Sequence, residues 1–157
     1  GPRPAGPAPA APPTAAPAAP GADADHHVEV LARTIWGEAR GGSRLGMEAV
    51  AACVLNRLRR KQPGRFGASV AEVCLKPLQF SCWNEGDPNL PKLKAVDERD
   101  ERFRLCLEIA RRAVAGTLAD PVSGSDHYHT VSVSPAWSAG RRPVRRIDDH
   151  LFFNDVP

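Results

Sequence analysis

The stretch of sequence that decides the fold is LARTIWGEARG, residues 31–41. Its apolar side chains stand at positions 31, 32, 35 and 39, and Val28 extends the pattern backwards. This i, i+3, i+4, i+7 spacing predicts an amphipathic helix with one buried face. Asp25 is a suitable N-cap for this helix, and Gly41 with Gly42 ends it.

Glu38 breaks the apolar pattern of this helix. It lies three positions after Ile35 and seven after Leu31, so it projects from the face that the apolar side chains share. A carboxyl group held against apolar neighbours keeps its proton more readily, because desolvation penalises the charged form. Glu38 is therefore a candidate general acid. In the alternative interpretation it turns into solvent or pairs with one of three arginines: Arg33, Arg40 or Arg57.

The rest of the chain predicts three further helices and a small β element. Ser43 begins a helix that ends before Pro63-Gly64, Ser69 opens a short capping-box helix, and a third runs from Asp97 to Gly116. Residues 78–96 are predicted to be a long irregular segment that lines a groove. Apolar residues alternate over 130–134 and the stretch 147–153 is extended, so the predicted fold class is α+β, mainly α.

Length and composition indicate one folded domain. The chain has 157 residues, and residues 1–22 are almost wholly Ala, Pro and Gly, which predicts a disordered linker before a domain at 23–157. Its 21 basic and 18 acidic residues give no footprint for nucleic acid. Neither a membrane span nor a charged leader before an apolar run is evident.

Four cysteines, at positions 53, 74, 82 and 106, allow free thiols or two bridges in any of three pairings. Cys74 and Cys82 flank a short loop, so a bridge between them is predicted. Cys53 and Cys106 fall in helical patterns and are either buried thiols or paired across two packed helices. No CxxC motif supports a redox or zinc site.

Several motifs in a fixed order resemble one known family. After residues 31–41 come GMEAVAA (46–52), VLNR (54–57), QFSCW (79–83), HYH (127–129) and PAW (135–137). Together they resemble the SleB-type cell-wall hydrolases, the family of the spore-cortex-lytic enzymes, over about residues 28–153.

The resemblance implies a lysozyme-like helical domain with a small β element near the C-terminus, similar to soluble lytic transglycosylases. In that family one Glu of the GEA motif, matched here by Glu38, cuts peptidoglycan glycan strands between N-acetylmuramic acid and N-acetylglucosamine. It further implies 1,6-anhydro products, no cofactor and a location in the periplasm or cell wall. We expect a monomer, and the Ala/Pro-rich stretch at residues 1–22 predicts a link to a signal or anchor upstream. Gly42 departs from the pattern, because relatives often have a second Glu there.

Weaker roles are expected for residues around the catalytic Glu. Phe80 and Trp83 offer apolar faces for sugar rings, although aromatic residues more often fill cores. Four polar residues could hydrogen-bond the saccharide: Gln79, Ser81, Tyr128 and His129. Asp87 is either a second carboxylate or a turn residue.

Two other functional classes compete with a glycosidase. In the first, a metal-dependent amidase or peptidase, the ligands would be three histidines with Asp126 or Asp148: His127, His129 and His150. In the second, a non-catalytic wall-binding module, anionic wall polymer would bind a basic turn of four arginines: Arg141, Arg142, Arg145 and Arg146.

Overall fold

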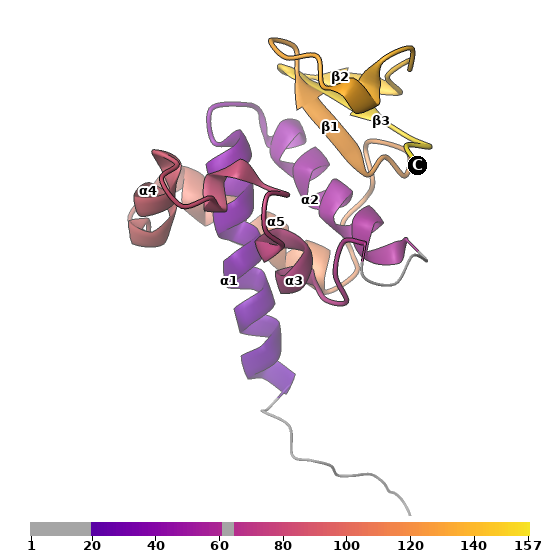
Figure 1. The fold of residues 1–157 in the computed structure, drawn as a ribbon. Helices are drawn as coiled ribbons and strands as arrows, with labels where there is room; N and C mark the ends of the chain where they lie inside the picture. Colours follow the sequence, from indigo (N-terminus) through magenta and orange to yellow (C-terminus); the bar gives the residue numbers. More distant parts are fainter. Residues whose placement is uncertain (1–19, 61–64) are drawn as a thin grey trace, which may run out of the picture.

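A computed structural model of the protein describes residues 20–60 and 65–157, and this part of the chain is mainly helical. Its α-helices are α1 (Pro20–Ala39), α2 (Arg44–Arg59), α3 (Val70–Leu75), α4 (Asn89–Ala95) and α5 (Glu101–Val114). Its strands are β1 (His127–Thr130), β2 (Arg145–Ile147) and β3 (His150–Phe153), and two 3-10 turns, η1 and η2, span Ser81–Trp83 and Ala136–Ser138. Figure 1 shows the helices gathered around α1 and the sheet at one end of them.

Helix α1 is the centre of the core. Leu31, Ala32 and Ile35 are fully buried, and α1 contacts α2, α3, α4 and α5. The amphipathic pattern of residues 28–39 therefore faces the core as predicted. The helix begins at Pro20, five residues before the predicted cap Asp25, and proline is tolerated in a first turn because its missing N–H needs no partner there. Most of the predicted linker lies outside the described residues.

Side-chain caps set the beginnings of the other helices. The Ser43 hydroxyl accepts the Gly46 N–H at 3.0 Å at the start of α2, as predicted. Ser69 likewise caps α3 by accepting the Glu72 N–H at 3.2 Å. Helix α5 begins later than predicted, because Asp100 and not Asp97 is its N-cap. The predicted break at Pro63-Gly64 lies outside the described residues.

Residues 78–96 are more regular than predicted. They contain η1 and the short helix α4, whose Leu93 is fully buried. Pro91 stands in the first turn of α4, where its ring obstructs no preceding carbonyl. Asp87 accepts the Asn89 N–H at 2.8 Å, which is the turn role that the sequence offered for it. The irregular segment is thus two short helical pieces joined by a turn.

The sheet has the antiparallel order β1-β3-β2. Tyr128 pairs with Phe152 and Thr130 with His150, and we call the face that these four side chains share the inner face. The outer face bears the alternate side chains: His127, His129, Leu151 and Phe153. On the inner face Phe152 is buried against α2.

Two details of the sheet differ from the sequence-based prediction. Strand β1 ends at Thr130, and Val131 and Val133 lie exposed in the following turn. The stretch 147–153 is not one strand, since Asp148 and Asp149 form the turn between β2 and β3.

The predicted Cys74–Cys82 bridge is wrong: all four cysteines are free and buried. Cys74 lies next to Thr34, whereas Cys82 lies against Gly37 and Glu38. Burial raises the pKa of Cys74 and of Cys106 to about 12, so both thiols stay protonated. The fixed position of residues 80–83 comes from packing on α1 and not from a covalent link.

Candidate active site

Glu38 occupies the last turn of α1, where it is half-buried and faces the sheet. The Tyr128 hydroxyl, contributed by β1, donates a hydrogen bond to Glu38 Oε1 at 2.5 Å. This bond joins residues that are 90 positions apart in the sequence. The Tyr128 hydroxyl bonds only Oε1, so the second carboxylate oxygen of Glu38, Oε2, has no hydrogen bond from Tyr128.

The three arginines that could have neutralised Glu38 are engaged elsewhere. Arg33 donates to the carbonyls of Leu93 and Val96, Arg40 donates to Asn89, and Arg57 donates to the Asp126 carbonyl. Within residues 20–60 and 65–157 no cationic side chain forms an ion pair with Glu38. The interpretation of Glu38 as one half of a surface ion pair is therefore wrong.

A close approach between α1 and η1 brings a thiol to Glu38. A Cβ atom on Gly37 would lie 2.8 Å from Cys82 Cβ and 2.9 Å from its Sγ, so only glycine lets the two segments meet. Burial together with the nearby charge of Glu38 raises the pKa of the Cys82 thiol. The thiol therefore stays protonated next to the carboxyl group.

Tyr128 is fixed by its neighbours on the inner face. Its ring centroid lies 4.9 Å from that of His150 and 5.5 Å from that of Phe152. Burial and the negative charge of Glu38 raise the pKa of the Tyr128 hydroxyl well above its usual value. Tyr128 consequently keeps its proton at neutral pH and acts toward Glu38 as a hydrogen-bond donor.

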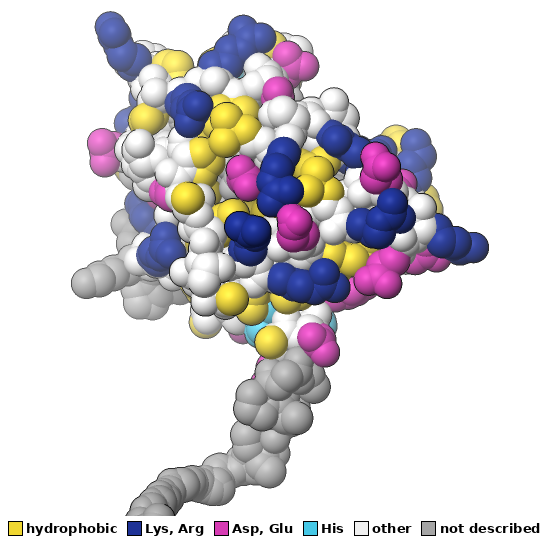
Figure 2. All heavy atoms as spheres, turned by 180° about the vertical axis from the view of Figure 1, so that it is seen from behind, with side chains coloured by type: hydrophobic (Ala, Val, Ile, Leu, Met, Phe, Trp, Pro, Cys, Tyr) yellow, Lys and Arg dark blue, Asp and Glu magenta, His cyan; other side chains and the backbone are white. Residues whose placement is uncertain are grey.

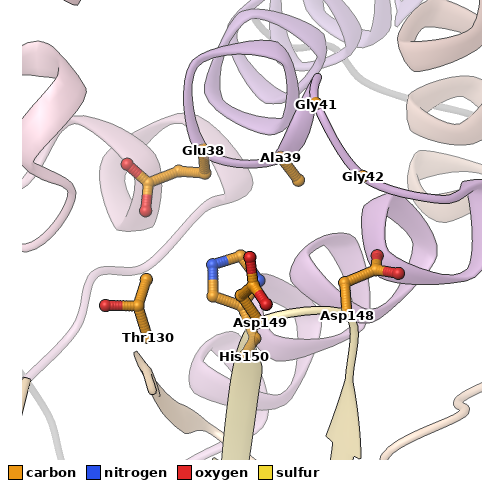
Figure 3. Close-up of a pocket in the computed structure, with 8 residues that line it drawn as sticks. All are labelled: Glu38, Ala39, Gly41, Gly42, Thr130, Asp148, Asp149 and His150. Atoms are coloured by element: carbon orange, nitrogen blue, oxygen red, sulfur yellow. The ribbon is translucent and has the colours of Figure 1, made fainter. Parts of the chain in front are cut away.

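Glu38 opens into a cavity of about 540 Å³. The cavity is lined by residues of α1, the α1–α2 turn and the sheet: Glu38, Ala39, Gly41, Gly42, Thr130, Asp148, Asp149 and His150. Figure 3 shows the Glu38 carboxylate and the Asp148 carboxylate at opposite ends, with the His150 ring between them. Burial lowers the pKa of His150 despite three carboxylates nearby, so its imidazole is neutral at pH 7.

A comparison with family models matches residues 41–153 to one described as Cell Wall Hydrolase. The chain belongs to the cell wall hydrolase family. Among curated proteins, this cell wall hydrolase is 30% identical over 138 residues to the spore cortex-lytic enzyme of Halalkalibacterium halodurans and 32% identical over 141 residues to that of Bacillus subtilis. These matches cover 86% and 85% of the chain, but only 37% and 39% of the relatives' lengths.

Solved structures confirm the predicted fold of the cell wall hydrolase. It matches the catalytic domain of the Bacillus cereus SleB protein with a TM-score of 0.65 and 23% identity, covering 83% of this chain and 91% of that one. It also matches the catalytic domain of the germination-specific lytic transglycosylase SleB from Bacillus anthracis, with a TM-score of 0.62, 23% identity and coverage of 82% and 93%. The family predicted from the ordered motifs is likewise confirmed.

Residues 79–83 lie beside the cavity of the cell wall hydrolase without lining it. Phe80 has 2% of its surface exposed and lies in the core near Arg57, so its ring has no free face for a sugar. Trp83 is half-buried and donates from Nε1 to the Thr34 hydroxyl at 2.9 Å. Gln79 accepts a long hydrogen bond of 3.5 Å from Arg57, and Ser81 is exposed.

The histidines of the cell wall hydrolase do not form the predicted alternative metal site. His127 and His129 lie on the outer face, whereas His150 lies on the inner face beside Tyr128. No group of three metal-ligating side chains occurs within the described ranges. His129, a predicted substrate ligand, packs against Trp137 and Phe153, on the opposite side of the sheet from Glu38. Because alternate strand residues point to opposite faces, Tyr128 and His129 cannot both reach Glu38.

The basic turn of the cell wall hydrolase is exposed but partly engaged. Arg141, Arg145 and Arg146 each donate to a backbone carbonyl, and Arg146 also lies 3.6 Å from Asp149. These bonds hold the loops next to the sheet.

Figure 2 shows the opposite side of the molecule from Figure 1, where basic side chains are spread among acidic and apolar ones without forming a continuous patch.

Sequence reasoning missed most of the cavity wall of the cell wall hydrolase. The sequence suggests His150 and Asp148 only as metal ligands, and nothing in it places Thr130 or the Cys82 thiol next to Glu38. Thr130 and His150 lie together because they pair across β1 and β3. The register of these strands cannot be predicted from the sequence unless the position of the turn at 148–149 is known.

Proposed function

We propose that this cell wall hydrolase cleaves peptidoglycan glycan strands between N-acetylmuramic acid and N-acetylglucosamine, as a lytic transglycosylase with Glu38 as its catalytic residue. The observation that carries the proposal is the Glu38 carboxyl, which forms no ion pair within the described part of the chain, is held by the Tyr128 hydroxyl and opens to the cavity. The similar proteins support it, since two are spore cortex-lytic enzymes and one solved domain belongs to a germination-specific lytic transglycosylase.

In the proposed first step, protonated Glu38 donates its proton to the glycosidic oxygen as the bond from the muramyl anomeric carbon to that oxygen breaks. The released N-acetylglucosamine end leaves with a hydroxyl group. Tyr128 holds Oε1, so Oε2 is the oxygen that transfers the proton. The hydroxyl donor of Tyr128 stabilises the carboxylate that this step creates.

In the second step the muramyl 6-hydroxyl oxygen bonds to the anomeric carbon and gives its proton to Glu38. This closes a 1,6-anhydro ring and returns Glu38 to its starting state, so no water is consumed. An ordinary glycosidase needs a second carboxylate to activate water or to attack the sugar. Here the substrate supplies its own nucleophile, and one acid–base residue is sufficient.

The proposal places the protein outside the cytoplasmic membrane, in the periplasm or cell wall, where peptidoglycan lies. It acts there as a monomer and without a cofactor. Among the described helices, none has the length and apolar character that a membrane span requires.

The test is Glu38→Gln, which keeps the shape of the side chain and removes its transferable proton. We expect at least a 100-fold loss of glycan cleavage, about the contribution of a general acid, with an unchanged melting temperature. Glu48→Gln, on α2 and paired with Arg44, is the matched control and should retain activity. Retention of a tenth of the activity by Glu38→Gln would contradict the proposal.

Mass spectrometry of the wild-type products tests the type of reaction. We expect muramyl ends lighter by one water molecule than reducing ends. Products with only reducing ends would show hydrolysis, and the cell wall hydrolase would then need a water-activating base.

A further inference from the structure

The carboxylate of Asp148 reaches from the sheet to the N-terminus of α2. Asp148 lies in the β2–β3 turn, yet its Oδ2 accepts hydrogen bonds from the Ser43 N–H and the Ser43 hydroxyl, both at 2.9 Å. Figure 3 shows it next to Gly42 in the wall of the cavity that holds Glu38.

Two glycines leave the space that this carboxylate fills. A Cβ atom on Gly42 would lie 2.6 Å from Asp148 Oδ2, and a Cβ on Gly46 would overlap the same oxygen even more closely. Helix α2 has no acidic residue in its first turn, and a helix N-terminus favours a negative charge. A side chain at position 42 and the Asp148 carboxylate therefore compete for one place.

The backbone at position 148 makes the presence of Asp notable. Its φ of 51° lies in the left-handed region that favours glycine, and Asp tolerates this region only because its side chain is short and polar. The carboxylate is thus kept where the backbone alone would prefer no side chain.

One oxygen of this carboxylate is left for a ligand. Oδ2 is held by Ser43, whereas Oδ1 accepts no hydrogen bond from any side chain or backbone group of residues 20–60 and 65–157. A carboxylate fixed through one oxygen is a pre-organised acceptor at the other, and hydrogen bonds to a charged acceptor are the stronger kind. Sugar hydroxyl groups and acetamido N–H groups are donors of the matching type.

We propose that Asp148 is a saccharide-binding residue whose Oδ1 accepts a hydrogen bond from a sugar hydroxyl or acetamido N–H in the Glu38 cavity. It supplies from the β2–β3 turn the second carboxylate that Gly42 does not provide. This inference rests on the proposed function for the nature of the ligand.

The first test measures binding of a peptidoglycan tetrasaccharide by calorimetry to the Glu38→Gln protein, which cannot cleave it. Adding Asp148→Asn keeps an amide oxygen for Ser43 and a residue type that tolerates positive φ, but it turns a donor toward the cavity. We expect Kd to rise about tenfold or more, the usual effect of losing a hydrogen bond to a charged group. In the Glu38 enzyme, the same change should raise KM while kcat stays within about threefold.

Asp155→Asn is the matched control, because it removes the same charge from another exposed Asp with a positive φ of 59°, and this residue does not line the Glu38 cavity. It should leave Kd within about twofold, as expected for an exposed charge. An unchanged Kd in Asp148→Asn, or an equal rise in Asp155→Asn, would overturn the inference.

The second test exchanges the two positions. Gly42→Glu alone should weaken binding, since its Cβ meets Asp148. Asp148→Gly suits the backbone and should also weaken binding, while Gly42→Glu combined with Asp148→Gly should recover at least part of the loss. If the double variant does not bind the tetrasaccharide more tightly than both single variants, the side chains at positions 42 and 148 do not compete for one space, and the inference is overturned.

The binding and cleavage measurements separate the two proposals. Tetrasaccharide binding that depends on Asp148, in a protein that leaves peptidoglycan uncut, supports this inference and refutes the proposed function. Cleavage of peptidoglycan by a protein whose tetrasaccharide binding does not depend on Asp148 supports the proposed function and refutes this inference. Absence of tetrasaccharide binding by the Glu38→Gln protein overturns the inference.

Discussion

The two faces of the small sheet are built from the same strands and do different things. The inner face gives Glu38 its hydroxyl donor through Tyr128 and places His150 in the cavity. The outer face packs two histidines and Phe153 around Trp137, with ring centroids 5.0–5.5 Å from the indole. Of the three consecutive aromatic residues 127–129, the middle one thus contacts Glu38 and the outer two pack against Trp137.

The difference shows that neighbours in a sequence motif need not share a role. His127 Nδ1 donates to the Asp126 carboxylate at 2.7 Å, and His129 Nδ1 donates to the Thr130 carbonyl, so both outer histidines have local partners. Tyr128 between them has a partner on another element. We therefore expect substitutions on the inner face to change catalysis and those on the outer face to change stability.

The largest expected effect is that of Tyr128→Phe on the inner face. It removes one hydroxyl and keeps the ring on His150 and Phe152, so the fold should persist. We expect kcat for glycan cleavage to fall about 10- to 100-fold, as for loss of a hydrogen bond to a charged group. The measurement is initial rate against peptidoglycan concentration.

His129→Gln is the control for this change, because it alters the next residue of the same strand on the outer face. Its kcat should stay within about threefold of the wild-type value, in the range of substitutions away from a functional site. A greater loss in His129→Gln than in Tyr128→Phe would reverse the assignment of the two faces.

An intermediate effect is expected for Trp137→Ala on the outer face. The indole contacts His127, His129 and Phe153, and its removal should lower the free energy of unfolding by about 1–3 kcal/mol. Urea titration followed by circular dichroism gives this value. The kcat of the remaining folded protein should change little, and a tenfold fall without unfolding would connect the outer face to catalysis.

The smallest effect concerns pH and His150. Burial holds the pKa of His150 in the folded state below its usual 6.5, so the unfolded chain binds more protons at this residue in the range below 6.5. The free energy of unfolding should therefore be highest above this pH and fall as the pH drops through it. His150→Gln should flatten this dependence near pH 6.

Asp126 acts in a different pH window. Burial raises the pKa of its carboxyl, but hydrogen bonds from His127 and Arg60 lower it more, so its net pKa lies below the usual 3.8. Its contribution to stability is present above that pH and is lost as the pH falls through the lowered value.

The two residues can therefore be separated by their pH ranges. A change in the free energy of unfolding near pH 6 that persists unchanged in His150→Gln would refute the role given to His150.

The helical part of the fold could be predicted because its information is local. The spacing of Leu31 and Ile35 fixed the buried face of α1, and Ser43 marked the start of α2. The same rules missed α4, because residues 78–96 were predicted to be irregular, whereas Pro91 is tolerated in the first turn of a short helix. The sheet was placed only approximately, because its register depends on the turn at Asp148.

The candidate site was predictable only in its helical half. Glu38 is conspicuous in the sequence because it lies on the apolar face of a helix. Its hydrogen-bond donor Tyr128 comes from a strand, and the sequence does not show which side of this strand faces α1. Alternation alone placed His127 and His129 together without saying which face looks toward α1. Phe80 and Trp83 were equivalent in sequence, and only packing distinguishes the buried ring from the half-buried one.

The hydrogen bond between Tyr128 and Glu38 has a consequence for how activity arises during synthesis. A nascent chain that has released all of its helices already has the acid, but lacks the hydroxyl that orients it until β1 has been made and has docked. Contacts between such distant residues form late, because the loop between them must close first. If Glu38 acts as proposed, we expect a chain that ends before β1 to lack glycan cleavage, because the hydroxyl donor to Glu38 has not yet been made.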